Sequence, residues 1–134
     1  MRFLLDVNAL VALGVVEHQF HSRTTAWVRT LRLQPESALL TCSITELGFV
    51  RVLSGAKSYG FTVATAVALL RRVKTEDERL FEFITDDRGA SGLPSWVAHP
   101  KQVTDGHLMR LAAVKNAALA TLDTRIPGAF VISE

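Results

Sequence analysis

The sequence predicts an α/β fold built around a central, mainly parallel sheet. Short apolar runs that suit buried strands alternate along the chain with longer segments of helical periodicity, and this alternation is typical of the fold class. A length of 134 residues suits one domain, and an apolar content of 49% is enough to fill one core. We therefore predict a single domain over residues 1–134.

The first predicted elements are a strand, two helices and a second strand. Residues 2–6 form a short buried strand that ends in an acid, and residues 7–16 form a nearly all-apolar helix that we expect to be buried. A second helix over residues 20–31 places its apolar side chains on one face and stops before Pro35. Residues 38–41 form the second strand.

The middle of the chain contains two further helices and a weaker strand. A helix runs from Ser43 to about Leu53 and breaks near Gly55. The next helix is indicated by apolar residues at spacings i, i+3, i+4 and i+7, which are Val63, Ala66, Val67 and Leu70. Residues 80–84 form the third strand, although acidic and aromatic residues alternate within it.

The last third begins with a loop and ends with strands. Residues 88–100 contain two glycines and two prolines, which is typical of a loop. A helix follows over residues 104–116, and residues 117–122 form a strand that leads directly into Asp123. Residues 129–132 form a last short strand.

Composition excludes several classes of protein. The longest uncharged apolar stretches have ten residues, whereas a membrane-spanning helix needs about 20, so we expect no membrane association. One cysteine, Cys42, cannot form an internal disulfide or a cysteine zinc cluster. The net charge of +2 implies no partner by itself, but eleven arginines stand against four lysines, and the planar guanidinium group suits phosphate. We expect a soluble, intracellular domain.

Four acidic residues occupy positions that suit a ligand site. Asp6 and Asp123 each follow a predicted strand, while Glu46 and Asp105 each lie in the first turn of a predicted helix. In open parallel sheets, ligands bind in the crevice beyond the carboxyl ends of the strands. The four acids can therefore converge at one edge of the sheet.

Each acid also has a structural explanation. Ser43 and Glu46 match a capping box, in which the acid bonds back to the first amide of the helix. Asp105 can interact favourably with the helix dipole, and Asp6 and Asp123 can be turn residues that close their strands.

Helical geometry favours the functional explanation. Glu46 and Asp105 lie on apolar stripes, because apolar residues follow each of them at offsets three, four and seven: Phe49, Val50 and Leu53, and Leu108, Met109 and Ala112. Clustered carboxylates repel one another and are costly to bury unless a cation neutralises them. Oxygen ligands select hard cations such as Mg²⁺ or Mn²⁺, which can activate water for attack on phosphorus. Without these four acids the chain has fifteen basic and nine acidic residues, so the pattern indicates a nuclease.

Four sequence segments carry a resemblance to a known family. They are FLLDVNAL at residues 3–10, SITEL at 43–47, QVTDGHL at 102–108 and LATLD at 119–123. In this order and spacing, the sequence resembles the PIN-domain ribonucleases, and among them the VapC-type toxins of bacterial and archaeal toxin–antitoxin pairs. Gly106 and His107 depart from the small residue and aromatic residue expected there, and a glycine in the first turn weakens a helix slightly.

The resemblance implies a fold, a site and partners. The fold is a three-layer α/β/α sandwich, and the protein is a cytoplasmic endoribonuclease that uses Mg²⁺ or Mn²⁺ to hydrolyse RNA. The resemblance assigns catalysis and metal binding to Asp6, Glu46, Asp105 and Asp123, with Asn8 and Thr104 as supporting residues. It also implies a homodimer that is inhibited by a cognate antitoxin, whose tail covers the acidic pocket.

Two other functions fit the same residues. A PIN-like domain can bind RNA or a protein partner without cleaving, although an intact set of four acids argues against this hypothesis. A small-molecule phosphatase is the second alternative. Other motifs are weaker: His18 and His21 lack further zinc ligands, His107 points away from Asp105 on a helix, and Trp96 is more typical of a packing anchor than of a base-stacking residue.

Overall fold

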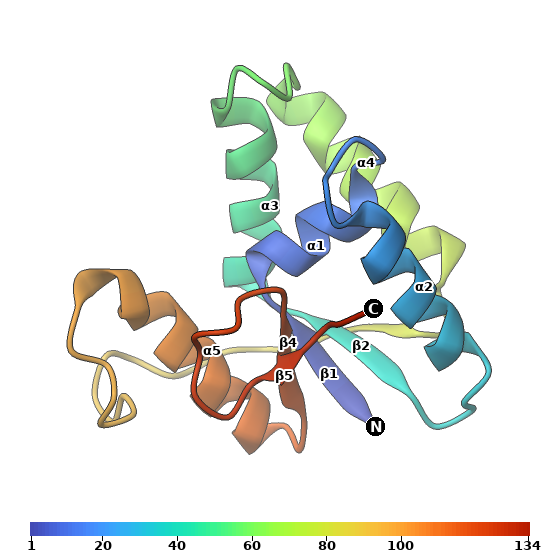
Figure 1. The fold of residues 1–134 in the computed structure, drawn as a ribbon. Helices are drawn as coiled ribbons and strands as arrows, with labels where there is room; N and C mark the ends of the chain where they lie inside the picture. Colours follow the sequence, from blue (N-terminus) through green and yellow to red (C-terminus); the bar gives the residue numbers. More distant parts are fainter.

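A computed structural model describes residues 1–134 as a five-stranded sheet covered by helices (Figure 1). The strand order is β3-β2-β1-β4-β5, and every neighbouring pair is parallel. The strands are β1 (Arg2–Leu5), β2 (Ala38–Thr41), β3 (Phe81–Phe83), β4 (Ala118–Thr121) and β5 (Phe130–Val131). The helices are α1 (Val7–Gly14), α2 (His21–Arg32), α3 (Ser43–Gly55), α4 (Val63–Glu76), the short 3₁₀ helix η1 (Pro100–Gln102) and α5 (Val103–Val114).

The central strands are buried on both faces, which explains their continuous apolar runs. Successive side chains of a strand point to opposite faces. In β1, Phe3 and Leu5 therefore enter one core, whereas Leu4 enters a second core together with its register partners Leu40 and Leu119. Parallel strands covered by helices on both faces have this composition.

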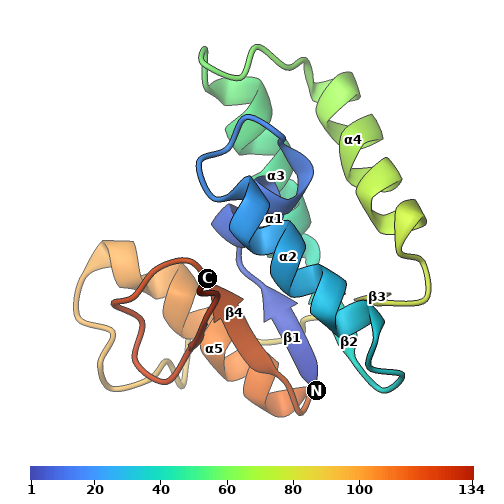
Figure 2. The ribbon, with the colours of Figure 1, turned by 45° about the vertical axis from the view of Figure 1, so that its right-hand side comes forward.

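The helices divide between the two faces. The first core contains residues of α1, α2, α3 and α4, whereas the second contains Leu108, Leu111 and Ala112 of α5. Figure 2 shows α2 and α5 on opposite sides of β1 and β4. The expected three-layer α/β/α arrangement is confirmed, with the sheet as its middle layer.

Helix α1 is nearly all apolar because it lies inside the larger helical layer. It contacts α2, α3 and α4 as well as strands β1 and β4. Its central residues, Ala9 to Ala12, are fully buried. Gly48 of α3 faces Val7 so closely that a Cβ atom there would overlap the valine side chain. This close packing holds the first turn of α1, and with it the end of β1, in a fixed place.

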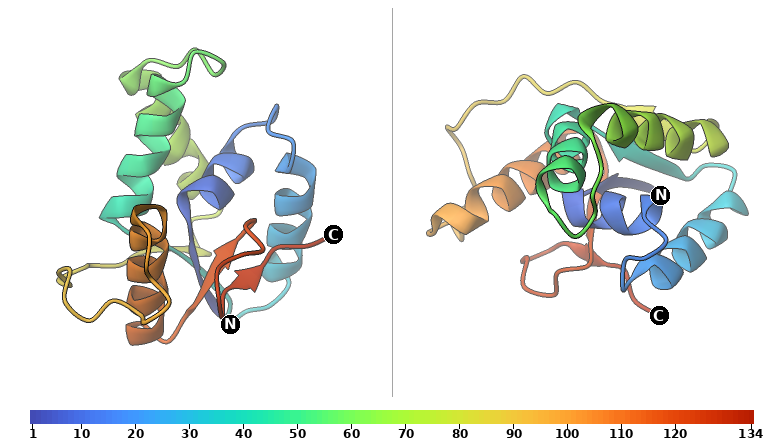
Figure 3. Two further views of the ribbon diagram at one scale, coloured as in Figure 1. Left: turned by 60° about the vertical axis from the view of Figure 1, so that its left-hand side comes forward. Right: turned by 90° about the horizontal axis from the view of Figure 1, so that it is seen from above.

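A long segment between β3 and α5 packs along the start of α5 (Figure 3). Gly106 makes the contact possible, because a Cβ atom at this position would collide with the Val97 side chain. The weakening effect expected of this glycine is therefore offset by the packing of the segment against α5.

Every predicted strand and helix is present, and the differences lie at the ends. The first helix ends at Gly14 rather than Val16, and the second begins at His21 rather than Phe20. The third strand is shorter than residues 80–84. None of the helices has both the length and the apolar content that a membrane-spanning segment needs.

Candidate functional site

Three of the four predicted acids share one pocket at the carboxyl edge of the sheet. Asp6 follows β1, Asp123 follows the adjacent strand β4 with one residue between, and Asp105 lies in the first turn of α5. The pocket has a volume of about 290 Å³. Its remaining polar lining comes from Asn8 and Thr104, the two predicted supporting residues. Parallel pairing of β1 and β4 brings the ends of these strands together, as the sequence predicted.

Asp6 is the most buried of these acids, with 7% of its surface exposed. Its carboxylate accepts hydrogen bonds from the backbone N–H of Ala9, at 2.8 Å, and from the hydroxyl of Thr121, at 2.5 Å. The pKa of Asp6 is raised to about 6, mainly by burial and in smaller part by the neighbouring carboxylates of Asp105 and Asp123, while the two hydrogen bonds oppose the rise. Asp6 thus caps α1, and its carboxylate is at the same time costly to ionise in the pocket.

Asp105 is half-buried, and its carboxylate has no hydrogen-bond partner. Gln102 precedes the helix and makes no side-chain cap, and Asp105 lies inside the first turn rather than at the cap position. Burial, followed by repulsion from Asp123, raises the pKa of Asp105. Capping therefore does not explain this carboxylate, although its position near the positive end of the helix dipole is favourable.

Asp123 is neutralised by a residue that the sequence reading overlooked. The carboxylate accepts a hydrogen bond from the backbone N–H of Arg125 at 2.8 Å, and the guanidinium group contacts both carboxylate oxygens at 3.0 Å. These contacts lower the pKa of Asp123. Asp123 therefore makes a contact typical of a turn residue, and the Asp-Thr-Arg spacing at residues 123–125 is the local signal that indicates it. Because Arg125 is exposed, its ion pair can exchange readily.

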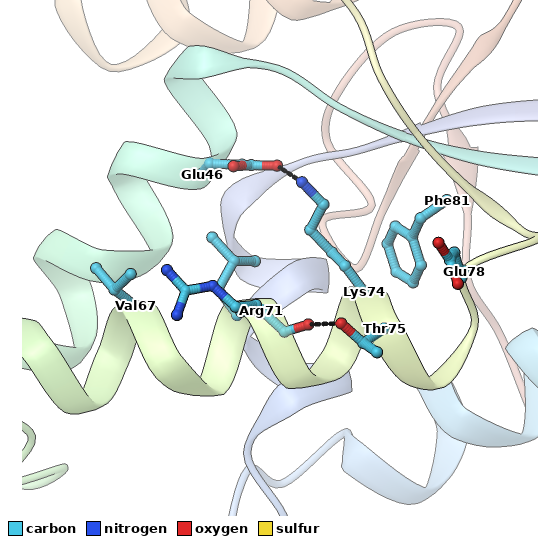
Figure 4. Close-up of a pocket in the computed structure, with 8 residues that line it drawn as sticks. Glu46, Val67, Arg71, Lys74, Thr75, Glu78 and Phe81 are labelled. Atoms are coloured by element: carbon cyan, nitrogen blue, oxygen red, sulfur yellow. Dashed lines mark hydrogen bonds and ion pairs between the residues drawn. The ribbon is translucent and has the colours of Figure 1, made fainter.

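Glu46 lies in a different pocket from the three aspartates. Its carboxylate accepts a hydrogen bond from the hydroxyl of Thr41 at 2.6 Å. The same carboxylate pairs with the ammonium group of Lys74, also at 2.6 Å (Figure 4). Lys74 belongs to α4, 28 positions further along the chain, so no local pattern could reveal this contact. The structure therefore does not bring Glu46 together with the other three acids.

The capping box predicted for Ser43 and Glu46 is wrong. Cys42 is the cap residue of α3, and the Thr45 hydroxyl accepts the backbone N–H of Cys42 at 3.0 Å. Threonine at the third helical position takes over the role that was expected of the acid. The carboxylate of Glu46 is thus free to reach Lys74.

The remaining polar candidates have structural partners. The His18 ring contacts the side-chain oxygen of Asn8 at 3.1 Å, and the His21 ring contacts the carbonyl oxygen of Ala12 at 2.8 Å. The two histidines do not share a zinc site. His107 turns away from Asp105, as predicted, and pairs with Asp86 at 2.5 Å.

The donor chemistry of the pocket suits a hard divalent cation. Asp6, Asp105 and Asp123 offer only oxygen ligands, and the carboxylate of Asp105 forms no ion pair, although the positive charge of nearby Arg125 acts to lower its pKa. No group of three or more acidic, histidine or cysteine side chains is arranged to hold an ion directly. Mg²⁺ commonly uses one or two protein carboxylates and retains several waters, so Asp6 and Asp105 are sufficient in number.

Comparison with known proteins gives full-length matches. Ribonuclease VapC44 of Mycobacterium tuberculosis is 36% identical over 140 residues, covering 96% of this chain and 94% of that protein. Ribonuclease VapC38 of the same organism is 34% identical, covering 98% of this chain and 89% of that protein, and ribonuclease VapC39 is 31% identical, covering 94% and 91%. No protein-family model matches the chain.

A solved structure has the same fold. The crystal structure of VapBC2 from Rickettsia felis bound to a DNA fragment from their promoter contains a chain that superposes with a TM-score of 0.59. The match covers 98% of this chain and 97% of that chain at 15% sequence identity. At this identity, the likeness establishes the arrangement of helices and strands alone.

Proposed function

The chain belongs to the VapC family of PIN-domain ribonucleases, the toxins of toxin–antitoxin pairs, and we propose that it hydrolyses RNA at the pocket formed by Asp6, Asp105 and Asp123. The observation that carries this assignment is the convergence of three carboxylates from three separate elements. Two of them, Asp6 and Asp105, have a raised pKa because they are buried near other carboxylates. Such clusters of perturbed groups are typical of functional sites.

The three aspartates contribute different properties to the pocket. Asp6 is held rigidly by Ala9 and Thr121, so it provides a fixed oxygen at the base of the pocket. Asp105 is unpartnered and more exposed, so its carboxylate is available to a ligand. Asp123 becomes available when Arg125 releases it.

Mg²⁺ or Mn²⁺ is the proposed cofactor. Asp6 and Asp105 would hold the ion, with Asp123 as a further oxygen ligand and with Asn8 and Thr104 at the rim. When bound, such an ion lowers the pKa of water and stabilises the oxygen that leaves phosphorus. We also propose Glu46 as a catalytic residue, a role that requires its side chain to leave Lys74 and turn toward the three aspartates.

A matched pair of variants tests the assignment. Asp105→Asn removes one charge while preserving shape, whereas Asp87→Asn makes the same change at an exposed position. Purified proteins are incubated with total RNA, with and without Mn²⁺, and the new RNA ends are mapped. We expect the Asp105 variant to lose cleavage by about 100-fold or more, as for loss of one group that stabilises charge at a reacting centre. Full cleavage by Asp105→Asn would refute the proposed site, and RNA binding without cleavage by the wild type would favour a binding module.

We also propose a cytoplasmic homodimer with a cognate antitoxin whose tail enters the acidic pocket. An arginine of the antitoxin can pair with the aspartates, because guanidinium groups bind carboxylates bidentately. Light scattering at micromolar concentration measures the oligomeric state, and expression of the protein in cells without an antitoxin measures toxicity. A monomer that cells tolerate without an antitoxin would contradict the proposal.

A further inference from the structure

A second pocket lies directly beside the catalytic pocket and shares two of its residues. Asp105 and Asp123 line both. The second pocket has a volume of about 170 Å³ and is otherwise formed mainly by Trp96, Lys101, Gln102 and Arg125. We call it the Trp96 pocket. A molecule bound across Asp105 and Asp123 therefore reaches both pockets.

The Trp96 side chain is held in place by its own packing and by contacts of the residues that follow it. Trp96 is half-buried and packs against the second core on one side while it faces the pocket on the other. The next residue, Val97, lies against Gly106 of α5. The side-chain oxygen of Gln102 accepts the backbone N–H groups of Ala98 and His99, at 2.8 and 3.0 Å. The indole ring is therefore preorganised rather than carried on a free loop.

The earlier half of the same segment is fastened to α5 as well. Asp86 pairs with the buried ring of His107, and the Arg110 guanidinium group donates hydrogen bonds to the carbonyl oxygens of Gly89 and Ser91. His107 and Arg110 belong to the helix that carries Asp105. Helix α5 thus fixes Trp96 and the catalytic carboxylate relative to each other.

The chemistry of the Trp96 pocket matches one nucleotide. Single-stranded RNA is bound by aromatic rings that stack on bases and by cations that contact phosphates. The pocket provides one indole ring, the exposed ammonium group of Lys101, which pairs with no acid, and the exposed guanidinium group of Arg125. Arg125 also closes the turn at Asp123, whereas Lys101 forms no ion pair in the fold, so its ammonium group is available to a phosphate.

We propose that the Trp96 pocket binds the nucleotide next to the cut phosphate, with its base stacked on Trp96 and its phosphate near Lys101 and Arg125. This inference rests on the proposed function, because it takes the RNA strand to cross Asp105 and Asp123. Contact of Arg125 with the RNA phosphate releases Asp123 at the same time. Trp96 is therefore a substrate-binding residue that selects the base at one position of the cut site.

Intrinsic fluorescence tests the proposal without cleavage. Trp27 and Trp96 are the two tryptophans, so Trp27→Phe leaves Trp96 as the single reporter. This variant is titrated with a short single-stranded RNA in EDTA, and the titration is repeated with an abasic residue at each position in turn. We expect the RNA to quench Trp96, and one abasic position to weaken binding by about 10-fold or more. Absence of quenching at every RNA concentration would overturn the proposal.

Two variants separate stacking from a general effect on folding. In the otherwise wild-type chain, Trp96→Leu should weaken RNA binding by about 10-fold, and the sensitive abasic position should no longer matter, whereas Trp96→Phe should retain most of the affinity. Lys101→Ala should lower the slope of log affinity against log salt by about one phosphate contact. An unchanged abasic profile in Trp96→Leu would overturn the proposal even if the wild type cleaves RNA. Failure of the proposed function is distinct, because it would appear as unchanged cleavage by Asp105→Asn.

Discussion

At the scale of single residues, the buried carboxylate of Asp6 makes stability depend on pH. Its pKa in the folded, metal-free protein is about 6, above the value of 3.8 for the unfolded chain. Because the pKa is raised, the stability that protonated Asp6 contributes is fully present below pH 3.8 and is lost as the pH rises through about 6. At neutral pH the raised pKa therefore lowers the unfolding free energy by roughly 3 kcal/mol.

We therefore predict that Asp6→Asn stabilises the metal-free protein at pH 7.5 by up to about 3 kcal/mol, with little effect at pH 4. Asparagine can still accept the Ala9 N–H and can donate to the Thr121 oxygen. Urea unfolding in EDTA at both pH values measures the difference. Asp87→Asn should follow the wild type at both pH values. Equal stability of Asp6→Asn and wild type at pH 7.5 would contradict the raised pKa.

Glu46 can be tested against its own ion pair. Glu46→Gln removes the charge but keeps an oxygen that accepts the Thr41 hydroxyl, whereas Lys74→Met breaks the same ion pair and keeps the carboxylate. If Glu46 is catalytic, we expect cleavage to fall by about 100-fold in the first variant only. Cleavage rates on one RNA, with thermal unfolding as the folding control, distinguish the two roles. Equal losses in both variants would show that the ion pair is structural.

The four acids illustrate how far the sequence leads at this scale. Strand ends predicted the positions of Asp6 and Asp123, and the apolar stripe after Asp105 predicted that it would face inward. The contact of Glu46 with Lys74 was beyond reach, because it joins residues from different helices and depends on how α3 packs against α4. The pairing of Asp123 with Arg125 was within reach, because the two residues lie in one turn.

At the scale of elements, Gly106 links the stability of α5 to the segment before it. Alanine has a higher helix propensity than glycine by about 1 kcal/mol, so an isolated α5 would gain from Gly106→Ala. In the protein, the added methyl group would collide with Val97, and such overpacking costs about 1–3 kcal/mol.

We predict that Gly106→Ala lowers the unfolding free energy by about 1 kcal/mol despite the better propensity. Gly55→Ala is the matched control, because this glycine is also in a helix and a Cβ atom there would meet nothing within 4 Å. Chemical unfolding should show the control to be neutral or more stable. Stabilisation by both substitutions would contradict the prediction, because it would mean that the Val97 side chain can move aside without lowering the unfolding free energy.

Element types and order were predictable from periodicity, whereas the details of helix ends were not. The i, i+3, i+4 and i+7 spacing from Val63 to Leu70 located α4 because one face of that helix packs on the core. The capping residue of α3 was misassigned because Cys42 is a rare cap, and its partner Thr45 competes with Glu46 for the same role. The packing role of Gly106 could not be predicted from helix periodicity, because the residue that it contacts, Val97, lies outside the helix.

At the scale of the whole molecule, metal binding should stabilise the fold. A ligand that binds only the folded state contributes RT ln(1 + [L]/Kd), or about 2.7 kcal/mol at 100 times the Kd. We predict a rise of roughly 10 °C in Tm at that concentration of Mn²⁺ or Mg²⁺, and a much smaller rise for Asp105→Asn. Ca²⁺ should raise the Tm without supporting cleavage, because its looser coordination misplaces the attacking water. A Tm that ignores millimolar Mn²⁺, with cleavage that survives EDTA, would contradict the metal assignment.

The overall architecture was the most predictable level, because alternating strands and helices leave few topologies. The apolar run within residues 2–6 predicted a buried strand, the resemblance to PIN domains implied helices on both faces of the sheet, and the structure has both. What the sequence could not provide was the position of residues 85–99, which form no regular element. Their path is set by side chains of α5 and by Gln102, and nothing in the sequence marks these side chains as the contacts of the segment.

The way α5 and the preceding residue Gln102 hold this segment bears on how such a protein can diverge. Arg110 and Gln102 hold main-chain atoms, the carbonyl oxygens of Gly89 and Ser91 and the amides of Ala98 and His99. Anchors of this kind tolerate almost any side chain at the residues they hold. Mutation can therefore alter the surface around Trp96 while the segment keeps its path and the carboxylates keep their places. Gene duplication followed by drift in these few positions would yield paralogues that cut different RNAs with an unaltered catalytic centre.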